Sequence, residues 1–163
     1  MRKKGLACFL ALVMLFSTFS CLSFPVSAAN ETGANVYSLE QYVGAGETLK
    51  VPVYISNNSG FLGFKLNFEY DSSILTPINV EYGEAISYGI EDNIEGDATE
   101  GKMSVYWAGT EDVTTEGIWF YINFSVNVKS KGKAEISVSY TQEDTFNENF
   151  EDVILNCSPI TIN

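Results

Sequence analysis

The 163-residue chain has no histidine, and its three cysteines and four prolines are few for its length. The absence of histidine excludes a Cys–His nucleophilic pair. Two of the cysteines, Cys8 and Cys21, lie in the N-terminal segment, so the rest of the chain has only Cys157 and cannot form an internal disulfide. Cys157 lies in the alternating segment ILNCSPITIN, which predicts a buried core thiol rather than a nucleophile.

Basic residues are scarce as well, since nine Lys and Arg stand against 21 Asp and Glu, for a formal net charge of −12. Three of the nine, Arg2, Lys3 and Lys4, lie at the N-terminus. The remaining six are too few to neutralise the phosphates of nucleic acid or of an anionic membrane, so we expect neither as a partner. The acidic surface either keeps the protein soluble or attracts a basic or calcium-loaded partner.

Motifs of catalysis and phosphate binding are missing too: there is no Gly-rich phosphate loop, no GxSxG elbow and no metal-spaced His or Cys. Acidic residues gather in segments 91–101 and 142–152, but neither has EF-hand spacing; counted from Asp144, the third position is Phe146. A calcium site of another kind in these loops stays open. Phe146 and Phe150 are expected to hold the second segment against the sandwich. A carboxylate pair among so many acidic residues is no specific sign of a hydrolase. We predict a non-enzyme with no cofactor and no resident metal.

The first 28 residues have the composition of a secretory signal peptide. A basic start is followed by an apolar stretch over residues 6–22, and the sequence VSA ends at Ala28, where we expect cleavage. The residues before Cys21 lack the leucine of a lipobox. We therefore predict export, removal of residues 1–28 and one domain over residues 29–163, whose length of about 135 residues is sufficient for a hydrophobic core.

The rest of the chain shows the alternation of β-strands and no helix of ordinary length. Val51, Val53 and Ile55 alternate with other residues, and after the turn NNSG the segment FKLNFEY continues this pattern. A side-chain period of two puts one row into a core and the other outside. The pattern predicts an all-β fold, a nine-stranded antiparallel β-sandwich with jelly-roll topology. The expected strands span residues 35–42, 48–56, 61–70, 74–82, 85–90, 102–108, 118–128, 134–141 and 153–162.

The direction of the Trp107 side chain bears on function, because it decides whether the strand that carries Trp107 has an exposed aromatic ring. In KMSVYWAG, alternation places Met103, Val105 and Trp107 on one face of the strand and the intervening residues on the other. An outward Trp107 would mark a binding face, and an inward one would be ordinary core. The residues of this strand are compatible with both.

The segment GETLKVPVYISNNSGFLGFKLNFEYDSSILTPINVEYG resembles the opening of a cohesin domain. In that family a V-x-V strand, a Gly-containing turn and a strand ending in YD-x-x-x-L lead into a V-x-x-G segment. The later stretches GKMSVYWAG, GIWFYINFSV and DVILNCSPITI also fit, so the resemblance covers residues 36–162. The matching positions are Val51-Pro52-Val53, Gly60, Gly63, Tyr70-Asp71, Leu75, Val80 and Gly83.

This resemblance implies a jelly-roll module that binds dockerins, which are small calcium-loaded helical domains of cellulosomal enzymes or scaffold proteins. One face, built by the third, fifth, sixth and eighth strands, holds the dockerin in that family. The resemblance also favours the outward direction for Trp107. Carried over by position, the expected partner-binding residues are Lys65, Asn67, Glu69, Tyr88, Ile90, Val105, Trp107, Ser137 and Ser139.

The alternative is a carbohydrate-binding module of a secreted polysaccharide-degrading system, since that class shares the fold and uses exposed Trp and Tyr as sugar platforms. A sugar site needs coplanar exposed aromatic rings, whereas a dockerin site needs a mixed apolar and polar face. In both cases we expect a secreted monomer without cofactor, which is extracellular or held at the cell surface through its partner.

Overall fold

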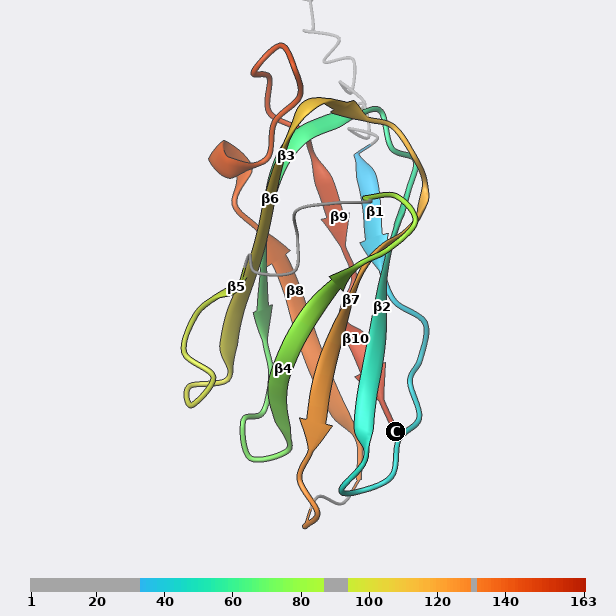
Figure 1. The fold of residues 1–163 in the computed structure, drawn as a ribbon, viewed down its shortest axis with the longest axis vertical. Coiled ribbons are helices and arrows are strands. Elements are labelled where there is room, and N and C mark those ends of the chain that lie inside the picture. Colours follow the sequence, from blue (N-terminus) through green and yellow to red (C-terminus); the bar gives the residue numbers. More distant parts are fainter. Residues whose placement is uncertain (1–32, 87–93, 130–131) are drawn as a thin grey trace, which may run out of the picture. The chain divides into compact units, whose positions relative to one another are not determined.

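The computed structural model describes residues 33–86, 94–129 and 132–163, which form two β-sheets packed face to face (Figure 1). The strand order is β4-β7-β2-β1-β9 in one sheet and β10-β8-β3-β6-β5 in the other. No helix in these ranges is long and apolar enough to span a membrane. The elements are β1 Ala34–Tyr37, β2 Thr48–Ser56, β3 Phe61–Glu69, β4 Leu75–Tyr82, β5 Ile94–Glu95, β6 Lys102–Val113, β7 Gly117–Val126, β8 Ala134–Tyr140, the 3-10 helix η1 Gln142–Asp144, β9 Leu155–Cys157 and β10 Ile160–Ile162.

The two sheets bury the apolar rows that the alternation predicts. In β2, Val51, Val53 and Ile55 are buried, while the residues between them are half-buried or exposed. In β3, Phe64 and Leu66 point inward and alternate with partly exposed residues. The predicted all-β sandwich is therefore confirmed.

A cluster of aromatic rings joins the sheets in the core. Phe61 and Phe64 come from β3, and Trp119 comes from β7 in the opposite sheet. Their ring centroids lie 4.7 Å apart for Phe61–Trp119 and 4.3 Å apart for Phe64–Trp119. Aromatic pairs of this kind contribute about 0.5–1.5 kcal/mol each beyond the burial of their area. Because these rings determine which row of β3 faces inward, they also determine which row faces solvent.

Three of the predicted strands differ clearly from the structure, and the first of them, expected at 35–42, ends at Tyr37 as β1. In the expected strand 85–90, Ala85 and Ile86 are buried but are not in a strand, and residues 87–90 lie outside the described residues. The short edge strand next to β6 is instead β5. The expected strand 153–162 is divided at Ser158–Pro159 into β9 and β10, which belong to different sheets. Proline cannot donate a ladder hydrogen bond, so a strand ends readily there.

The chain also contains one parallel pairing that the sequence did not predict. β9 runs parallel to β1, with Val36 opposite Cys157, whereas the other named strand pairs in the described ranges are antiparallel. This pairing brings residues 155–157 beside β1 and makes β9 the outermost strand of the first sheet.

Candidate functional site

Four neighbouring strands of the second sheet, β8, β3, β6 and β5, present a continuous outer face (Figure 1). β3 is central, because it pairs with β6 on one side and with β8 on the other. One transverse row crosses all four strands and consists of Ser139, Asn67, Ser104 and Glu95. We call the outward residues of these strands the four-strand face: Lys65, Asn67, Glu69, Glu95, Lys102, Ser104, Tyr106, Ala108, Ser137 and Ser139.

Asn67 is the centre of a hydrogen-bond network on this face. Its Oδ1 accepts a bond of 2.7 Å from Ser104 Oγ on β6, and its Nδ2 donates a bond of 3.2 Å to Thr141 Oγ1 just after β8. These two bonds hold the amide in one orientation. An amide oxygen has two lone pairs and the NH₂ group has two protons, so Asn67 keeps one further acceptor and one further donor site for a partner.

An ion pair and a shallow hollow lie next to this network. Lys65 Nζ is 3.3 Å from Glu95 Oε2, with the two side chains 30% and 59% exposed. The hollow has a volume of ≈ 460 Å³ and opens between β3, β6 and the segment after β8. The residues that line it are Phe64, Lys65, Glu95, Tyr106, Trp107, Ala108, Asp144 and Phe146, of which Phe64 and Trp107 are buried.

Val105 and Trp107 do not belong to this face. Their side chains are 0% and 2% exposed, so the prediction that they point outward is wrong. The Trp107 ring joins the aromatic cluster of the core, with its centroid 5.8 Å from that of Phe61 and 6.3 Å from that of Phe64. Burying an indole of this size outweighs the benefit of displaying it on an otherwise polar face.

The other predicted site residues fall into two groups. Lys65, Asn67, Glu69, Ser137 and Ser139 lie together on the four-strand face, as expected from their positions in β3 and β8. Tyr88 and Ile90 are outside the described residues, and their part in the site stays a prediction.

Sequence reasoning missed several residues of the site. Tyr106 and Ser104 are outward because Trp107 is inward, so the period of two would have found them once the direction of Trp107 was known. Glu95 and Phe146 come from segments without a clear alternation, and no local pattern indicates that they reach this face.

The described residues offer little evidence for other chemistry. No group of three or more His, Cys, Asp or Glu side chains within the described ranges is placed to hold a metal ion. Cys157 is partly buried, and this burial raises the pKa of its thiol to about 11. A thiol with such a pKa is almost entirely protonated at neutral pH and is a poor nucleophile.

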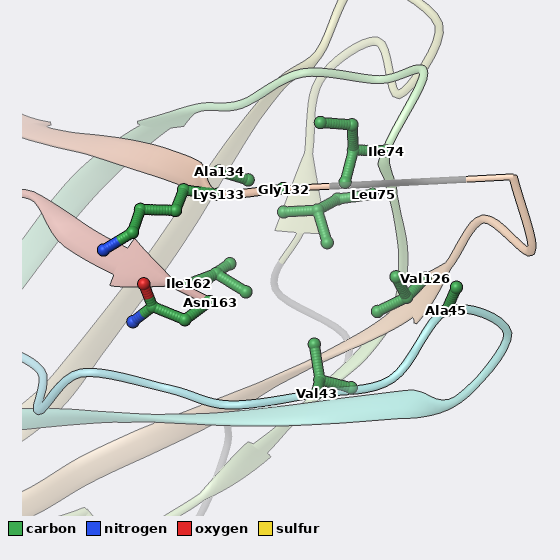
Figure 2. A pocket seen from close by; sticks show the side chains of 10 residues that line it. All are labelled: Val43, Ala45, Ile74, Leu75, Val126, Gly132, Lys133, Ala134, Ile162 and Asn163. Carbon is green, nitrogen blue, oxygen red and sulfur yellow. The ribbon is translucent and has the colours of Figure 1, made fainter.

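A second hollow, of ≈ 280 Å³, lies where the ends of β7 and β10 approach the start of β8 (Figure 2). Figure 2 shows that aliphatic side chains from several segments surround it. Ligand pockets usually add a few converging polar groups that fix the orientation of the ligand. Here the polar side chains are only two, those of Lys133 and Asn163, so the four-strand face is the better candidate.

Comparisons with known proteins agree with this architecture. The family model for the cohesin domain matches residues 38–161. The chain resembles the sixth cohesin of scaffoldin B from Acetivibrio cellulolyticus, solved with a dockerin, with 23% identity, a TM-score of 0.69 and coverage of 81% of this chain and 99% of that chain. The cohesin of the OlpA cohesin–dockerin complex from Clostridium thermocellum gives 17% identity, a TM-score of 0.69 and coverage of 80% and 98%.

A non-cellulosomal cohesin from the archaeon Archaeoglobus fulgidus is similar at 16% identity and a TM-score of 0.67, with coverage of 80% of this chain and 89% of that chain. At such low identities these structures show that the fold is shared. No curated protein sequence matches the chain significantly.

Proposed function

Because the chain belongs to the cohesin family, we propose that it binds a calcium-loaded dockerin through the four-strand face. The match of the family model over residues 38–161 carries this proposal, since it spans nearly the whole sandwich. As a cohesin domain the chain is a protein–protein interaction module, and the proposal assigns it no catalytic activity. The calcium would be bound by the dockerin, because a dockerin folds around its calcium ions and presents a rigid surface only then.

The chemistry of the face supports this proposal. Asn67 offers hydrogen bonds at the centre, and Tyr106 and Ala108 supply apolar area beside it. The pair Lys65–Glu95 adds charge near the edge strand. Such a mixture suits a folded protein surface better than a nucleic acid.

The proposal extends to where and with what the chain works. The segment 1–28 has the pattern of a secretory signal, so we place the mature domain outside the cell, free or held at the surface through its partner. There it would dock an enzyme or a scaffold protein into a cellulosome-type complex. One similar structure is a non-cellulosomal cohesin. Whether the complex is of the cellulosome type is therefore decided by the identity of the protein that carries the dockerin.

Carbohydrate binding is the second candidate function, and one observation favours it. On the outer face of the other sheet, the rings of Tyr37 and Tyr54 stack with their centroids 5.4 Å apart and an interplanar angle of 16°. Tyr121 lies on the same face, opposite Pro52, which is two positions from Tyr54 on β2. However, Lys50 Nζ lies 4.1 Å from the centroid of the Tyr121 ring and covers it. On the four-strand face the described strand residues include a single aromatic ring, that of Tyr106. We therefore rank dockerin binding first.

The test is a calorimetric titration of the chain with dockerins encoded in the same genome, with and without calcium. We expect tight binding that is lost on chelation. Ser139→Arg introduces a large charged side chain next to Asn67 and should abolish binding. Ser125→Arg makes the same change at an exposed position of β7 in the opposite sheet and should leave the affinity unchanged.

Two results would contradict the proposal. Equal affinity of the Ser139→Arg and unaltered chains would exclude the four-strand face as the binding surface. The carbohydrate alternative would be established if the chain bound no dockerin but was retained on insoluble polysaccharide. In that case, Ser125→Arg or a change at Tyr54 should abolish the retention.

A further inference from the structure

Phe150 is the most exposed large apolar side chain in the described part of the chain, with 79% of its surface accessible. Its backbone has φ 60°, in the left-handed region that a bulky aromatic residue rarely adopts. The other non-glycine residue with positive φ in the described ranges is Asn57, a residue type that tolerates this conformation. Burial in the core therefore does not explain the presence of this ring.

The ring of Phe150 is joined to the four-strand face through Phe146. It stacks on the ring of Phe146, with centroids 5.9 Å apart and an interplanar angle of 18°. Phe146 in turn covers Gly63, which pairs with Ala108 in the outward row of β3: a Cβ atom at Gly63 would lie 3.0 Å from Phe146 Cζ. Phe146 also lines the ≈ 460 Å³ hollow beside Lys65 and Tyr106. The two-ring stack therefore extends the candidate site beyond the strands themselves.

The backbone around the stack is held in place by hydrogen bonds. The amides of Leu62 and Gly63 donate to the carbonyl oxygen of Phe146 at 2.7 and 3.1 Å, and the Phe146 amide donates to Gly63 O at 3.0 Å. Asn147 Oδ1 accepts bonds from the amides of Asn149 and Glu151, at 2.9 and 3.0 Å. A ring that folding has already positioned loses little further freedom on binding, which favours affinity.

The charge around the stack is mostly negative, and Lys65, which lines the same hollow as Phe146, is paired with Glu95. Residues 134–163 contain no Lys or Arg. Asp112 Oδ1 accepts a bond of 2.7 Å from the Glu148 amide, which brings a further carboxylate to the segment. A partner that places its own acidic residues here would be repelled, whereas Lys or Arg would be attracted. The acidic side chains of residues 134–163 are Glu135, Glu143, Asp144, Glu148, Glu151 and Asp152.

We propose that Phe150, supported by Phe146, is a specificity-determining contact that packs against an apolar side chain flanked by Lys or Arg on the dockerin. This inference rests on the dockerin binding proposed above and names the chemistry of the partner at one end of the site. The aromatic rings supply apolar contact area, and the surrounding carboxylates select which dockerins approach in the correct orientation.

The test compares Phe150→Asn with Tyr42→Asn by calorimetric titration against a calcium-loaded dockerin that binds the unaltered chain. Tyr42 is a matched control, because its aromatic side chain is 74% exposed and lies outside the four-strand face. We expect Phe150→Asn to lower the affinity at least tenfold and Tyr42→Asn to change it less than twofold. Asparagine tolerates the left-handed backbone, which offsets the loss of the stack on Phe146, so the Tm of Phe150→Asn should stay close to that of the unaltered chain.

A second variant, Glu148→Lys, tests the charge of the partner. It should weaken binding at low ionic strength, and the loss should shrink as salt is added. Unchanged affinity of Phe150→Asn, or a fall in its Tm large enough to explain weaker binding, would overturn the inference while dockerin binding stands. Tighter binding by Glu148→Lys would overturn the basic flank. If the unaltered chain binds no dockerin, the proposed function fails and this inference fails with it.

Discussion

The six-membered ring of Trp107 occupies the space that a side chain at Gly109 would need. A Cβ atom at position 109 would overlap Cη2 of the indole and would also lie 3.0 Å from its Cζ2. The two residues are separated by one position on β6, so both project toward the core. The missing side chain of Gly109 is thus what allows a buried tryptophan at this end of the strand.

Gly109→Ala should therefore destabilise the protein, because the added methyl group must displace a ring that is packed on both sides. Overpacking of this kind costs about 1–3 kcal/mol. Thermal or urea unfolding measures the loss. Gly44→Ala is the matched control, since the atoms nearest to a Cβ there belong to the end of the exposed, flexible side chain of Glu47, and the stability should change by less than about 0.5 kcal/mol.

A double variant makes this prediction sharper. The smaller ring in Trp107→Phe should leave room for the methyl group, so Gly109→Ala should cost less in the Trp107→Phe background than in the unaltered chain. Additive losses in the two variants would show that the residues do not compete for the same space.

Alternation was sufficient to predict the sandwich and the outward row of β3. The segment FKLNFEY has one apolar and one mostly polar row, so Lys65, Asn67 and Glu69 were placed without reference to other strands. The direction of Trp107 could not be predicted in this way, because both rows of its strand carry an aromatic residue. Its direction depends on contacts with Phe61 on another strand, and a pattern within one strand does not contain such contacts.

The segments outside the main strands were the least predictable. Phe146 and Phe150 were both expected to hold the second acidic segment against the sandwich; Phe146 does so on the outer face of β3, where it covers Gly63, whereas Phe150 is exposed. The division of the last strand at Pro159 was foreseeable only in part, since proline indicates an interruption but not that β9 and β10 join different sheets. These features depend on pairings between residues far apart in the sequence.

Asn67→Leu should weaken dockerin binding while the fold persists. Leucine has a similar size, but it cannot form the hydrogen bonds that Asn67 has available for a partner. A partner group left unpaired in the interface costs about 1–3 kcal/mol, which corresponds to a loss of affinity of roughly 5-fold to 150-fold. Asn35→Leu, at an exposed position of β1 in the opposite sheet, is the control for a general effect of the added apolar surface. Equal affinities of the two variants would remove Asn67 from the interface.

Stability should depend on the ionisation of Glu81. Its Oε2 lies 2.8 Å from Lys50 Nζ and its Oε1 accepts a 2.6 Å bond from Asn123 Nδ2. The hydrogen bond from Lys50, followed by that from Asn123, holds the pKa of Glu81 below its ordinary value of 4.5. A depressed pKa in the folded state stabilises the protein above the unfolded pKa, and this stabilisation is lost as the pH falls through the folded pKa.

The comparison with Glu81→Gln isolates this contribution. The difference in Tm between the unaltered chain and Glu81→Gln should be constant above about pH 5 and should shrink as the pH falls below 4.5, the ordinary value. Melting curves between neutral and acidic pH measure it. A difference that stays the same throughout would mean that the carboxylate is not stabilised in the folded state.

Cys157 should react slowly with alkylating reagents as long as the protein is folded. Burial raises the pKa of its thiol to about 11, whereas an exposed thiol has a pKa near 8.5, so at pH 8 the reactive thiolate is on the order of 100-fold rarer.

Iodoacetamide labelling, followed by the mass of the peptide that contains Cys157, measures the rate separately from Cys8 and Cys21. The rate should rise about tenfold per pH unit up to pH 10, because the thiolate fraction does so below the pKa. In urea the same peptide should be labelled at the rate of a free thiol; an equally fast reaction without urea would contradict the packing of Cys157 between β1 and the core.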